Sequence, residues 1–596
     1  MKIIFTRLEN IRRHTIFWIL ATAAAAYGFW YAWHIRWTCD DIYITLRYID
    51  HWFKGEGLVY NAGEHVEGYT HFLWLLLVAG AGRLGADMMD ASVWLGLFSF
   101  PGLILLSARR AQRIGLSVPV AALYLCVHHD MGVWATGGLE TMFYALLVFA
   151  AFYVRFQSRL PYPRKLWAAG LLCALSILTR PDAALLLAWF FIQETALCLW
   201  WRTPFRETVK SLFLLGIFPL LLLTPWLVWK WEFYGSLLPN TYYAKSGGLS
   251  YFSQGWIYLD SYARAYVSVY AAAALGLAGI VAGFRKRAGG GSPAEVPLHA
   301  QSLSVLLFVV LYAVVFIAKS GGDYMYARFM IPVAALCLIP AENALAAWTA
   351  APKPAWRYAA VWILALCWAA FGFVELGFRN SLFRDPVTGN MGGKWKMKIY
   401  DSHTHHKDAY PSEKYRRIGE EMRPVFAGTK ARVLNFGDCC LCYYAGFDYV
   451  LENFGLTDTY IAHKPLLTRE TMVGHEKYAE REYMDRRQVQ LCFNGPDFSG
   501  REFTKITFIS SAGDTVRGDI LRYDLPLMQA VAANGGSGIR FTDARVWFDS
   551  LLADREAAGK DSLRHAYESN LSYYFEPNRH LEAVRRQEER INGFIR

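Results

Sequence analysis

Charged residues are scarce in this chain of 596 residues, because Asp, Glu, Lys and Arg make up 19% of it, against about 25% in soluble proteins. They are also unevenly placed, since the last 218 residues hold 62 of the 111 charges. The mean hydropathy of +0.18 therefore averages two unlike parts. This pattern excludes a cytosolic enzyme, a disordered chain and a simple secreted protein. It predicts an all-α membrane domain over residues 1–378 and a soluble α/β domain over residues 379–596.

Several common site signatures are missing. Cys439, Cys440, Cys442 and Cys492 cluster in the tail without the paired CxxC spacing of a zinc site, so a disulfide is expected there rather than a metal. The segment at Gly437 lacks the GxGxxG fingerprint of a dinucleotide site. The net charge of +11 lies mostly in the membrane part, which indicates loops that face anionic lipid rather than a nucleic-acid partner.

The apolar runs predict about eleven membrane crossings. The first run is preceded by basic residues and has no small-residue cleavage site. It is therefore expected to be a retained helix with a cytoplasmic N-terminus. A run over 71–82 is too short to span a ~30 Å core and is predicted to be re-entrant or interfacial. Basic loops alternate with short or acidic ones, which places the tail outside the cytoplasm. The eleven runs cover residues 15–33, 91–108, 117–135, 139–156, 166–179, 183–201, 209–231, 263–284, 302–319, 328–349 and 356–378.

Two adjacent carboxylates, Asp40 and Asp41, follow the first crossing among Trp33, Trp37 and Tyr43. They are either solvated loop charges, or the N-cap of the next stretch, or catalytic groups. An aromatic surround removes water from a carboxylate and raises its pKa toward that of a general base. One of the two is predicted to act on a hydroxyl while the other orients the site or holds a cation. A divalent cation is compatible with these groups, but no ligand spacing demonstrates one.

Other polar residues fall in loops that this topology places on the same outer face. Ionisable groups at membrane depth are costly and mark function, so they are predicted to converge on one site. The cations suit a phosphate, although an arginine before Pro181 also serves to end a helix. Asp323 follows two glycines as a turn residue or a second site carboxylate. For His128, a hydrogen-bonding role is favoured over metal binding. The predicted set is Tyr69, His128, Glu140, Arg180, Asn240, Tyr243, Lys245, Asp323 and Arg328.

These motifs together resemble a known family. An Asp-Asp pair after the first transmembrane helix is typical of GT-C glycosyltransferases, and the finer resemblance is to the terminal β-arabinofuranosyltransferases of actinobacterial cell walls. The matching stretches are DDIYITLRYIDHWFKGEGLVYNAGEHVEGYTHFLW (40–74), the segments 138–145 and 178–182, WEFYGSLLPNTYYAK (231–245), GGDYMYARFMIP (321–332), NFGLTDTYIAH (453–463) and GHEK (474–477).

The resemblance implies a GT-C fold with an α/β domain on the outer side and one catalytic carboxylate in the Asp-Asp pair. It implies a polyprenyl-phosphate sugar as donor, an envelope glycan or glycolipid as acceptor, and membrane lipid as surroundings; the sugar, arabinofuranose-like or other, is left open. The alternative is a transporter or flippase with an accessory domain. That class predicts polar residues toward both faces and often an inverted repeat, and neither is evident.

The tail shows the mixed pattern of an α/β domain. Short strands are expected over 431–436, 449–452, 489–493 and 520–523, and amphipathic helices over 543–556 and 579–591. Asp458 and His475 either reach over the membrane site or serve as turn and capping residues.

Overall fold

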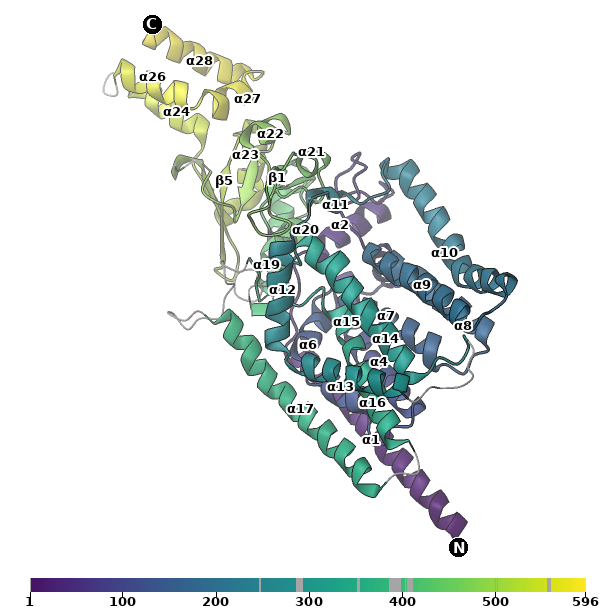
Figure 1. The fold of residues 1–596 in the computed structure, drawn as a ribbon. Helices are drawn as coiled ribbons and strands as arrows, with labels where there is room; N and C mark the ends of the chain where they lie inside the picture. Colours follow the sequence, from purple (N-terminus) through teal and green to yellow (C-terminus); the bar gives the residue numbers. More distant parts are fainter. Residues whose placement is uncertain are drawn as a thin grey trace.

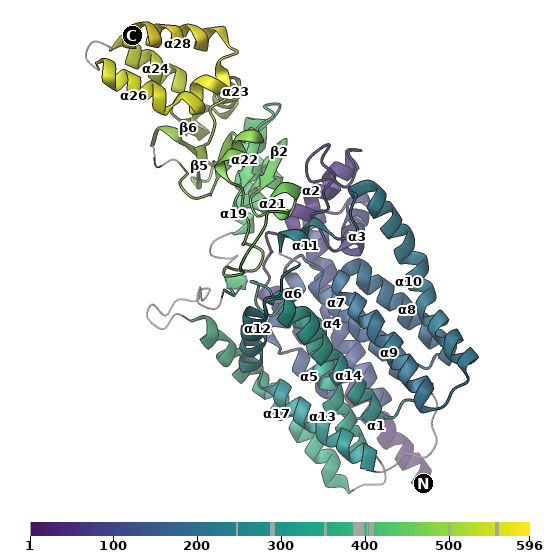
Figure 2. The same ribbon diagram turned by 45° about the horizontal axis from the view of Figure 1, so that its top comes forward.

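A helical body and a mixed tail make up the computed structural model of this chain. It describes residues 2–245, 248–285, 293–350, 354–384, 398–401, 403–404, 411–498, 500, 502–554 and 559–596. Figure 1 shows the long helices of the body packed together, with the sheet beyond one end of them and the C-terminal helices beyond the sheet. Figure 2 gives the same order along the molecule.

The body consists of helices that differ greatly in length. α14 continues into a π-helical segment over Ala313–Ala318. The helices are α1 (Lys2–His34), α2 (Ile42–Phe53), α3 (Phe72–Arg83), α4 (Met88–Arg113), α5 (Val120–Leu125), α6 (His129–Thr136), α7 (Thr141–Gln157), α8 (Tyr162–Thr179), α9 (Ala184–Trp200), α10 (Phe205–Tyr234), α11 (Asn240–Ala244), α12 (Phe252–Ala265), α13 (Ser268–Arg285), α14 (Leu298–Tyr312), α15 (Ile331–Ala334), α16 (Ile339–Thr349) and α17 (Ala355–Phe383).

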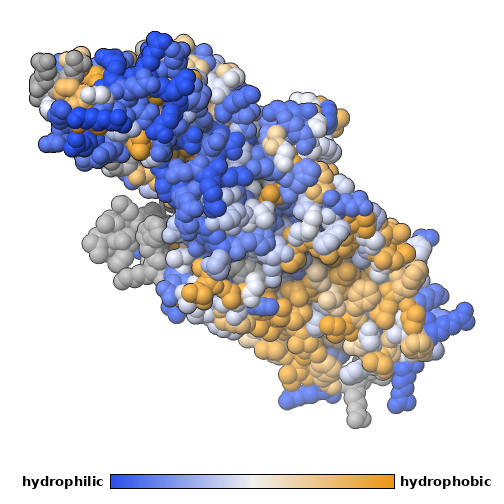
Figure 3. Space-filling model, turned by 90° about the horizontal axis from the view of Figure 1, so that it is seen from above, coloured by the Kyte–Doolittle hydropathy of each residue, from blue (hydrophilic) through white to orange (hydrophobic). Residues whose placement is uncertain are grey.

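Within the described residues, eight helical segments are long and apolar enough to cross a membrane, or nine if the pair α6 and α7, bent by 116°, forms one broken span. The predicted count of about eleven stays a prediction. One difference lies at 117–135, where the expected single helix is replaced by α5 and α6 with a break before His129. The short run near 71–82 forms α3, an apolar helix of 12 residues, and its relation to a membrane stays a prediction. The surface agrees with a membrane body, since Figure 3 shows apolar residues gathered over the helices and polar ones over the tail.

The tail is built on one six-stranded sheet in the order β2-β1-β3-β5-β4-β6. The first three strands are parallel and the last three antiparallel. The strands are β1 (Arg432–Asn435), β2 (Tyr449–Glu452), β3 (Leu491–Phe493), β4 (Lys505–Ile509), β5 (Thr515–Ile520) and β6 (Ile539–Phe541). The helices are α19 (Ser412–Phe426), α20 (Cys439–Ala445), α21 (Thr459–Ala462), α22 (Arg481–Arg486), α23 (Leu525–Gly535), α24 (Ala544–Ala553), α26 (Lys560–Ser569), α27 (Glu576–Asn578) and α28 (Glu582–Ile595).

The sequence located part of this sheet. The strands expected over 431–436, 449–452 and 489–493 correspond to β1, β2 and β3, and the expected helices to α24 and α28. The strand expected over 520–523 meets only the last residue of β5, whereas β4 and β6 were not expected. Buried and partly buried residues alternate along β4, as is typical of an antiparallel strand with one face in the core. Five residues are too few for this alternation to predict the strand from sequence. The predicted domain boundary after residue 378 falls inside α17 and stays a prediction.

Buried polar contacts join the body to the tail. The Arg379 guanidinium on α17 donates to both oxygens of Asp401, at 2.7 Å each, and to Asp130 at 3.0 Å. On α2, Arg47 donates to the backbone carbonyls of Phe447 at 3.0 Å and Asp448 at 3.2 Å. A buried arginine with full partners fixes its neighbours strongly. The tail is therefore held against the end of the body where the predicted site residues lie.

Candidate active site

A cavity of about 380 Å³ lies between the body and the tail. Its walls come from α2, the loop before α3, the turn between α8 and α9, α11 with the residues beside it, the end of α14 with the loop that follows it, and the tail loops near 456 and 469–473. Six of the predicted site residues line it: Asp41, Tyr69, Arg180, Lys245, Asp323 and Arg328. Side chains separated by almost 300 residues in sequence thus converge on one space.

Arg328 stands at the centre of the charged groups of this cavity. Its Nη1 lies 3.9 Å from Oδ2 of Asp41 and 3.6 Å from Oδ2 of Asp323, and its Nη2 lies 3.4 Å from Oε1 of Glu140. The side chain of Asp41 is 28% exposed, while that of Asp323 is 1% exposed. One guanidinium therefore separates an accessible carboxylate from a buried one.

Glu140 is fully buried behind the cavity wall and orients three groups that face it. Oε1 of Glu140 accepts from Arg180 at 2.8 Å and from Arg328 at 3.4 Å. Oε2 lies 3.3 Å from Nδ1 of His71. The local fold depends on Gly138, whose φ of +79° is a left-handed conformation that glycine adopts without strain. This turn begins α7 directly after Glu140.

The Gly-Gly-Asp motif forms a turn that only glycine fits. Gly321 and Gly322 have φ values of +91° and +73°. A Cβ on Gly322 would lie 2.5 Å from Cγ of Tyr258. The turn brings Asp323 beside Arg328, with Oδ2 of Asp323 buried and without a hydrogen-bond partner among the described residues. From the sequence, Asp323 was either a turn residue or a second carboxylate of the site. In the structure it follows the two-glycine turn and also lines the cavity.

The two adjacent aspartates face different surroundings. Asp40 is buried and points away from the cavity, and its oxygens accept the backbone N–H groups of Cys439 at 2.8 Å and Cys440 at 2.9 Å. Burial raises the pKa of Asp40 to about 6, although these hydrogen bonds lower it. Asp41 lines the cavity. The aromatic surround was expected to raise the pKa of a catalytic carboxylate in this pair. The carboxyl group with the raised pKa is that of Asp40, which does not line the cavity.

Besides Asp40 and Glu140, three further predicted residues lie outside the cavity lining and have structural contacts. Nδ2 of Asn240 donates to the backbone carbonyls of Gly455 at 2.8 Å and Leu456 at 3.1 Å, which ties α11 to the tail. The ring of Tyr243 stacks on His463 at 4.3 Å. His128 caps α6 and its Nε2 lies 3.0 Å from the Tyr262 hydroxyl. In the tail, Asp458 caps α21 and His475 packs edge-on against Tyr324.

The structure adds cavity residues that the motifs did not single out. Lys319 ends the apolar segment of α14, and its ammonium group has no ion-pair partner within the described ranges. The same holds for Lys245. Arg469, from the tail, is paired with Glu476 at 2.8 Å. A lysine at the end of an apolar run, separated from Gly-Gly-Asp only by Ser320, was a usable signal for Lys319.

The disulfide expected in the tail is wrong. All ten cysteines are free thiols, and those of the tail are buried. Cys439, Cys440 and Cys442 lie on the short α20, and Cys492 lies in the core on β3, so packing accounts for their burial. No group of three or more His, Cys, Asp or Glu side chains with metal-binding geometry occurs in the described part of the chain.

Comparison with known proteins supports the resemblance. No family model matches the chain. It is 27% identical over 345 residues to a terminal beta-(1→2)-arabinofuranosyltransferase of Mycobacterium tuberculosis, covering 53% of this chain and 53% of the relative. It is 26% identical over 355 residues to the protein of the same name from Corynebacterium glutamicum, covering 54% and 50%. The chain thus spans about half the length of these curated relatives.

Solved structures of ArnT from Cupriavidus metallidurans also align. The one bound to undecaprenyl phosphate has a TM-score of 0.47 and 13% identity, covering 72% of this chain and 85% of that one. The apo structure has a TM-score of 0.47 and 12% identity, covering 85% and 98%. The family resemblance inferred from the motifs is confirmed by the sequence comparisons: this membrane-type helical chain is similar to the terminal beta-(1→2)-arabinofuranosyltransferases.

Proposed function

We propose that this protein is a glycosyltransferase that moves a sugar, arabinofuranose in the first instance, from a polyprenyl-phosphate donor to a glycan or glycolipid of the cell envelope. One observation carries the proposal: an accessible carboxylate, Asp41, shares a cavity with two lysines that lack carboxylate partners among the described residues. A donor phosphate and an acceptor hydroxyl need these two kinds of group. The names of the sequence relatives supply the sugar.

The cations of the cavity divide into two kinds. Arg180 is balanced by Glu140 and Asp182, and Arg328 by Glu140 and Asp323. Lys245 and Lys319 have no ion-pair partner in the part of the chain that the structure describes, so they are the proposed partners of the donor phosphate. A charge-assisted contact of this kind is worth about 1.5–3 kcal/mol. The arginines then hold the carboxylates in place and add positive potential around the phosphate.

The reaction follows from these positions. Asp41 takes the proton of the acceptor hydroxyl, the hydroxyl oxygen bonds to the anomeric carbon, and the bond from that carbon to the phosphate oxygen breaks. The electron pair leaves with the phosphate, where the lysines stabilise it. This route inverts the anomeric carbon. If Asp41 instead attacks that carbon as a nucleophile, a second displacement restores the configuration. NMR of the product distinguishes the two courses.

The lipid tail of the donor has an apolar wall to lie against. Leu238, Leu249, Val315 and Phe316 line the same cavity, and the last two belong to the π-helical segment that ends at Ala318. Such segments occur often at functional sites because they break the regular packing of a helix. Lys319 follows directly, so the proposed phosphate position lies where the apolar wall ends.

The proposed setting is the outer face of a bacterial cytoplasmic membrane, with the tail outside the cytoplasm and no nucleic-acid partner. The basic loops of the body support this orientation. The tail closes over the cavity through Leu456, Arg469 and Val473, so both parts of the chain are needed for the proposed site.

Proteoliposomes separate this function from that of a flippase. Purified protein is incubated with radiolabelled polyprenyl-phosphate arabinofuranose and an arabinofuranosyl oligosaccharide. We expect label to appear in a lengthened oligosaccharide. Movement of the labelled lipid between leaflets without a new glycosidic product would instead support the transporter class.

A further inference from the structure

A second cavity, of about 530 Å³, lies on the other side of the segment that carries the aspartates. It is bounded by the end of α1, the start of α4 and the start of α19 in the tail. Thr38 and Tyr43 line this cavity, whereas Asp41, Ile44 and Thr45 line the cavity of about 380 Å³ described above, called the reaction cavity from here on. One short stretch of chain is thus the wall between two spaces.

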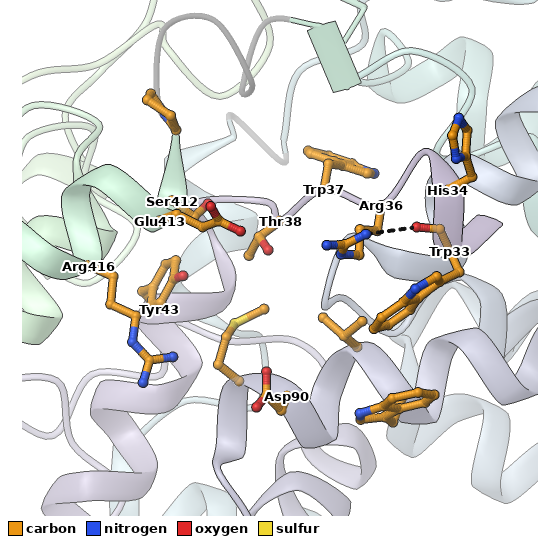
Figure 4. A pocket seen from close by; sticks show the side chains of 14 residues that line it. Trp33, His34, Arg36, Trp37, Thr38, Tyr43, Asp90, Ser412, Glu413 and Arg416 are labelled. Atoms are coloured by element: carbon orange, nitrogen blue, oxygen red, sulfur yellow. Dashed lines mark hydrogen bonds between the residues drawn. The ribbon is translucent and has the colours of Figure 1, made fainter. Parts of the chain in front are cut away.

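Aromatic rings form one side of the second cavity. Trp33 and Trp94 stack with centroids 5.0 Å apart, and both are more than one third exposed. Trp37 is fixed by a hydrogen bond from its Nε1 to the carbonyl of Val133 at 2.7 Å. Figure 4 shows the Trp33 and Trp37 rings on the side of Arg36 and away from Arg416. Trp37 is only 5% exposed, and the Trp33 ring carries the Arg36 guanidinium 4.7 Å from its centroid, so the ring suited to stack against the C–H face of a sugar is that of Trp94, which is 40% exposed.

Polar side chains with free capacity form the rest of the lining. Asp90 and Glu413 make no side-chain ion pair within the described residues, while Arg36 donates to the Trp33 carbonyl at 3.4 Å and lies over the Trp33 ring, 4.7 Å from its centroid. Figure 4 shows Arg36 and Glu413 on either side of Thr38, with Asp90 below them. By contrast, Arg416 is paired with Glu420 at 3.0 Å and Asp87 at 3.6 Å. Two carboxylates and one guanidinium therefore remain available to a ligand.

The charges select a neutral ligand rather than an anionic one. Two free carboxylates against a single free guanidinium repel a phosphate headgroup, because like charges close together are unfavourable. A chain of hydroxyl groups satisfies all three, since carboxylates accept from hydroxyls and the guanidinium donates to them. Pockets that bind such ligands pair an aromatic floor with a few polar groups.

We infer that the second cavity is an outer subsite for the neutral acceptor glycan, which holds sugar units remote from the reacting hydroxyl. This inference rests on the proposed function, because the second cavity can hold an acceptor only if the protein transfers sugar to a glycan. The reacting unit enters the cavity of Asp41, and the remaining units lie along the seam between body and tail. A long acceptor gains contacts there that a short acceptor lacks.

Equilibrium binding tests the inference without any donor. Full-length protein in detergent micelles is titrated with a linear arabinofuranosyl disaccharide and octasaccharide, followed by calorimetry. In Trp94→Ala and, separately, Glu413→Gln, the Kd for the octasaccharide is expected to rise about tenfold, as expected for the loss of one aromatic or charge-assisted contact, while disaccharide binding is unchanged. Trp200→Ala is the matched control, because Trp200 is 72% exposed and ends α9 outside both cavities.

The outcomes separate this inference from the proposed function. Octasaccharide binding that weakens in both variants supports the subsite, even if the wild type transfers no sugar. Wild-type binding of the octasaccharide that neither variant changes overturns it, even if transfer is observed. Preference for phosphatidylethanolamine vesicles, with no oligosaccharide binding, also overturns it in favour of a lipid headgroup. Melting curves of each variant show whether the fold is intact, and Glu413→Gln retains the shape of the side chain.

Discussion

The carboxylate of Asp40 in the body accepts the backbone N–H of Cys440 in the tail at 2.9 Å. Its other oxygen accepts from Cys439 at 2.8 Å, so the start of α20 holds both oxygens. This contact fixes the residue next to Asp41. Asp40 is therefore assigned a positioning role, and the tail takes part in shaping the reaction cavity.

Asp40→Asn is expected to destabilise the protein and to reduce transfer indirectly. The amide group presents N–H donors toward a backbone N–H, which leaves one buried donor unsatisfied at a cost of about 1–3 kcal/mol. A lower melting temperature and a reduced kcat are expected together. The paired variant Asp41→Asn should keep the wild-type melting temperature. Equal melting temperatures for Asp40→Asn and the wild type would contradict a stabilising role for the hydrogen bonds from Cys439 and Cys440 to Asp40.

Removing the two free lysines is expected to weaken donor binding. Lys245→Met and Lys319→Met each remove a proposed phosphate contact, and each should raise the KM for the polyprenyl-phosphate donor about tenfold or more. The KM for the acceptor should stay unchanged. Lys210→Met is the control, because Lys210 is 61% exposed, pairs with Glu207 in the same helix and does not line the cavity. Steady-state kinetics with varied donor measure the effect, and an unchanged donor KM in both variants refutes the phosphate site.

Glu140→Gln is expected to lower activity by releasing Arg180 and Arg328. Breaking one partner of a buried ion pair costs about 3–5 kcal/mol of stability, so destabilisation alone proves little. The matched control is Glu194→Gln, because Glu194 forms an equally buried pair with Arg155, at 2.7 Å, outside the cavity. Both variants should lose stability, but only Glu140→Gln should lose kcat per folded molecule. Equal kcat in the two variants would argue against a positioning role for Glu140.

The tail is expected to be more stable at pH 5 than at pH 8. Burial, and then the neighbouring Asp40, raises the pKa of Asp438 from 3.8 to about 7. Since the folded state holds this proton more tightly than the unfolded state, the stabilisation is complete below about pH 4 and is lost as the pH rises through about 7.

Asp438→Asn cannot titrate, so it should reduce the difference in melting temperature between pH 5 and pH 8. Thermal unfolding of the full-length protein in detergent measures this. The control is Asp561→Asn, whose side chain is 99% exposed. A pH difference that is equally large in Asp438→Asn and the wild type would rule out this carboxyl as its source.

The sequence was most informative where single residues carry strong constraints. The Asp-Asp pair, the Gly-Gly-Asp turn and the isolated cations were located because charge is rare in apolar surroundings. Which aspartate faces the cavity could not be predicted, since the answer depends on α20, some 400 residues further along the chain. Asn240 and His128 were expected in the site for their polarity, but tertiary contacts use them to join segments.

The fold shows the same division. Long apolar helices such as α4 and α17 were predicted from hydropathy alone, because their length and composition suffice. The break between α5 and α6 was missed, as the run 117–135 is continuously apolar up to His128. Strands β4 and β6 were missed because short antiparallel strands depend on their partners for stability.

The most direct test of the central claim is the transfer of label from polyprenyl-phosphate arabinofuranose to an arabinofuranosyl acceptor by the wild type and by Asp41→Asn. Loss of a general base or nucleophile lowers rates by about 10²–10⁴-fold, so the variant should lose at least about 100-fold in kcat while it melts at the wild-type temperature. Transfer by Asp41→Asn at the wild-type rate, or no transfer by the well-folded wild-type protein, would contradict the account.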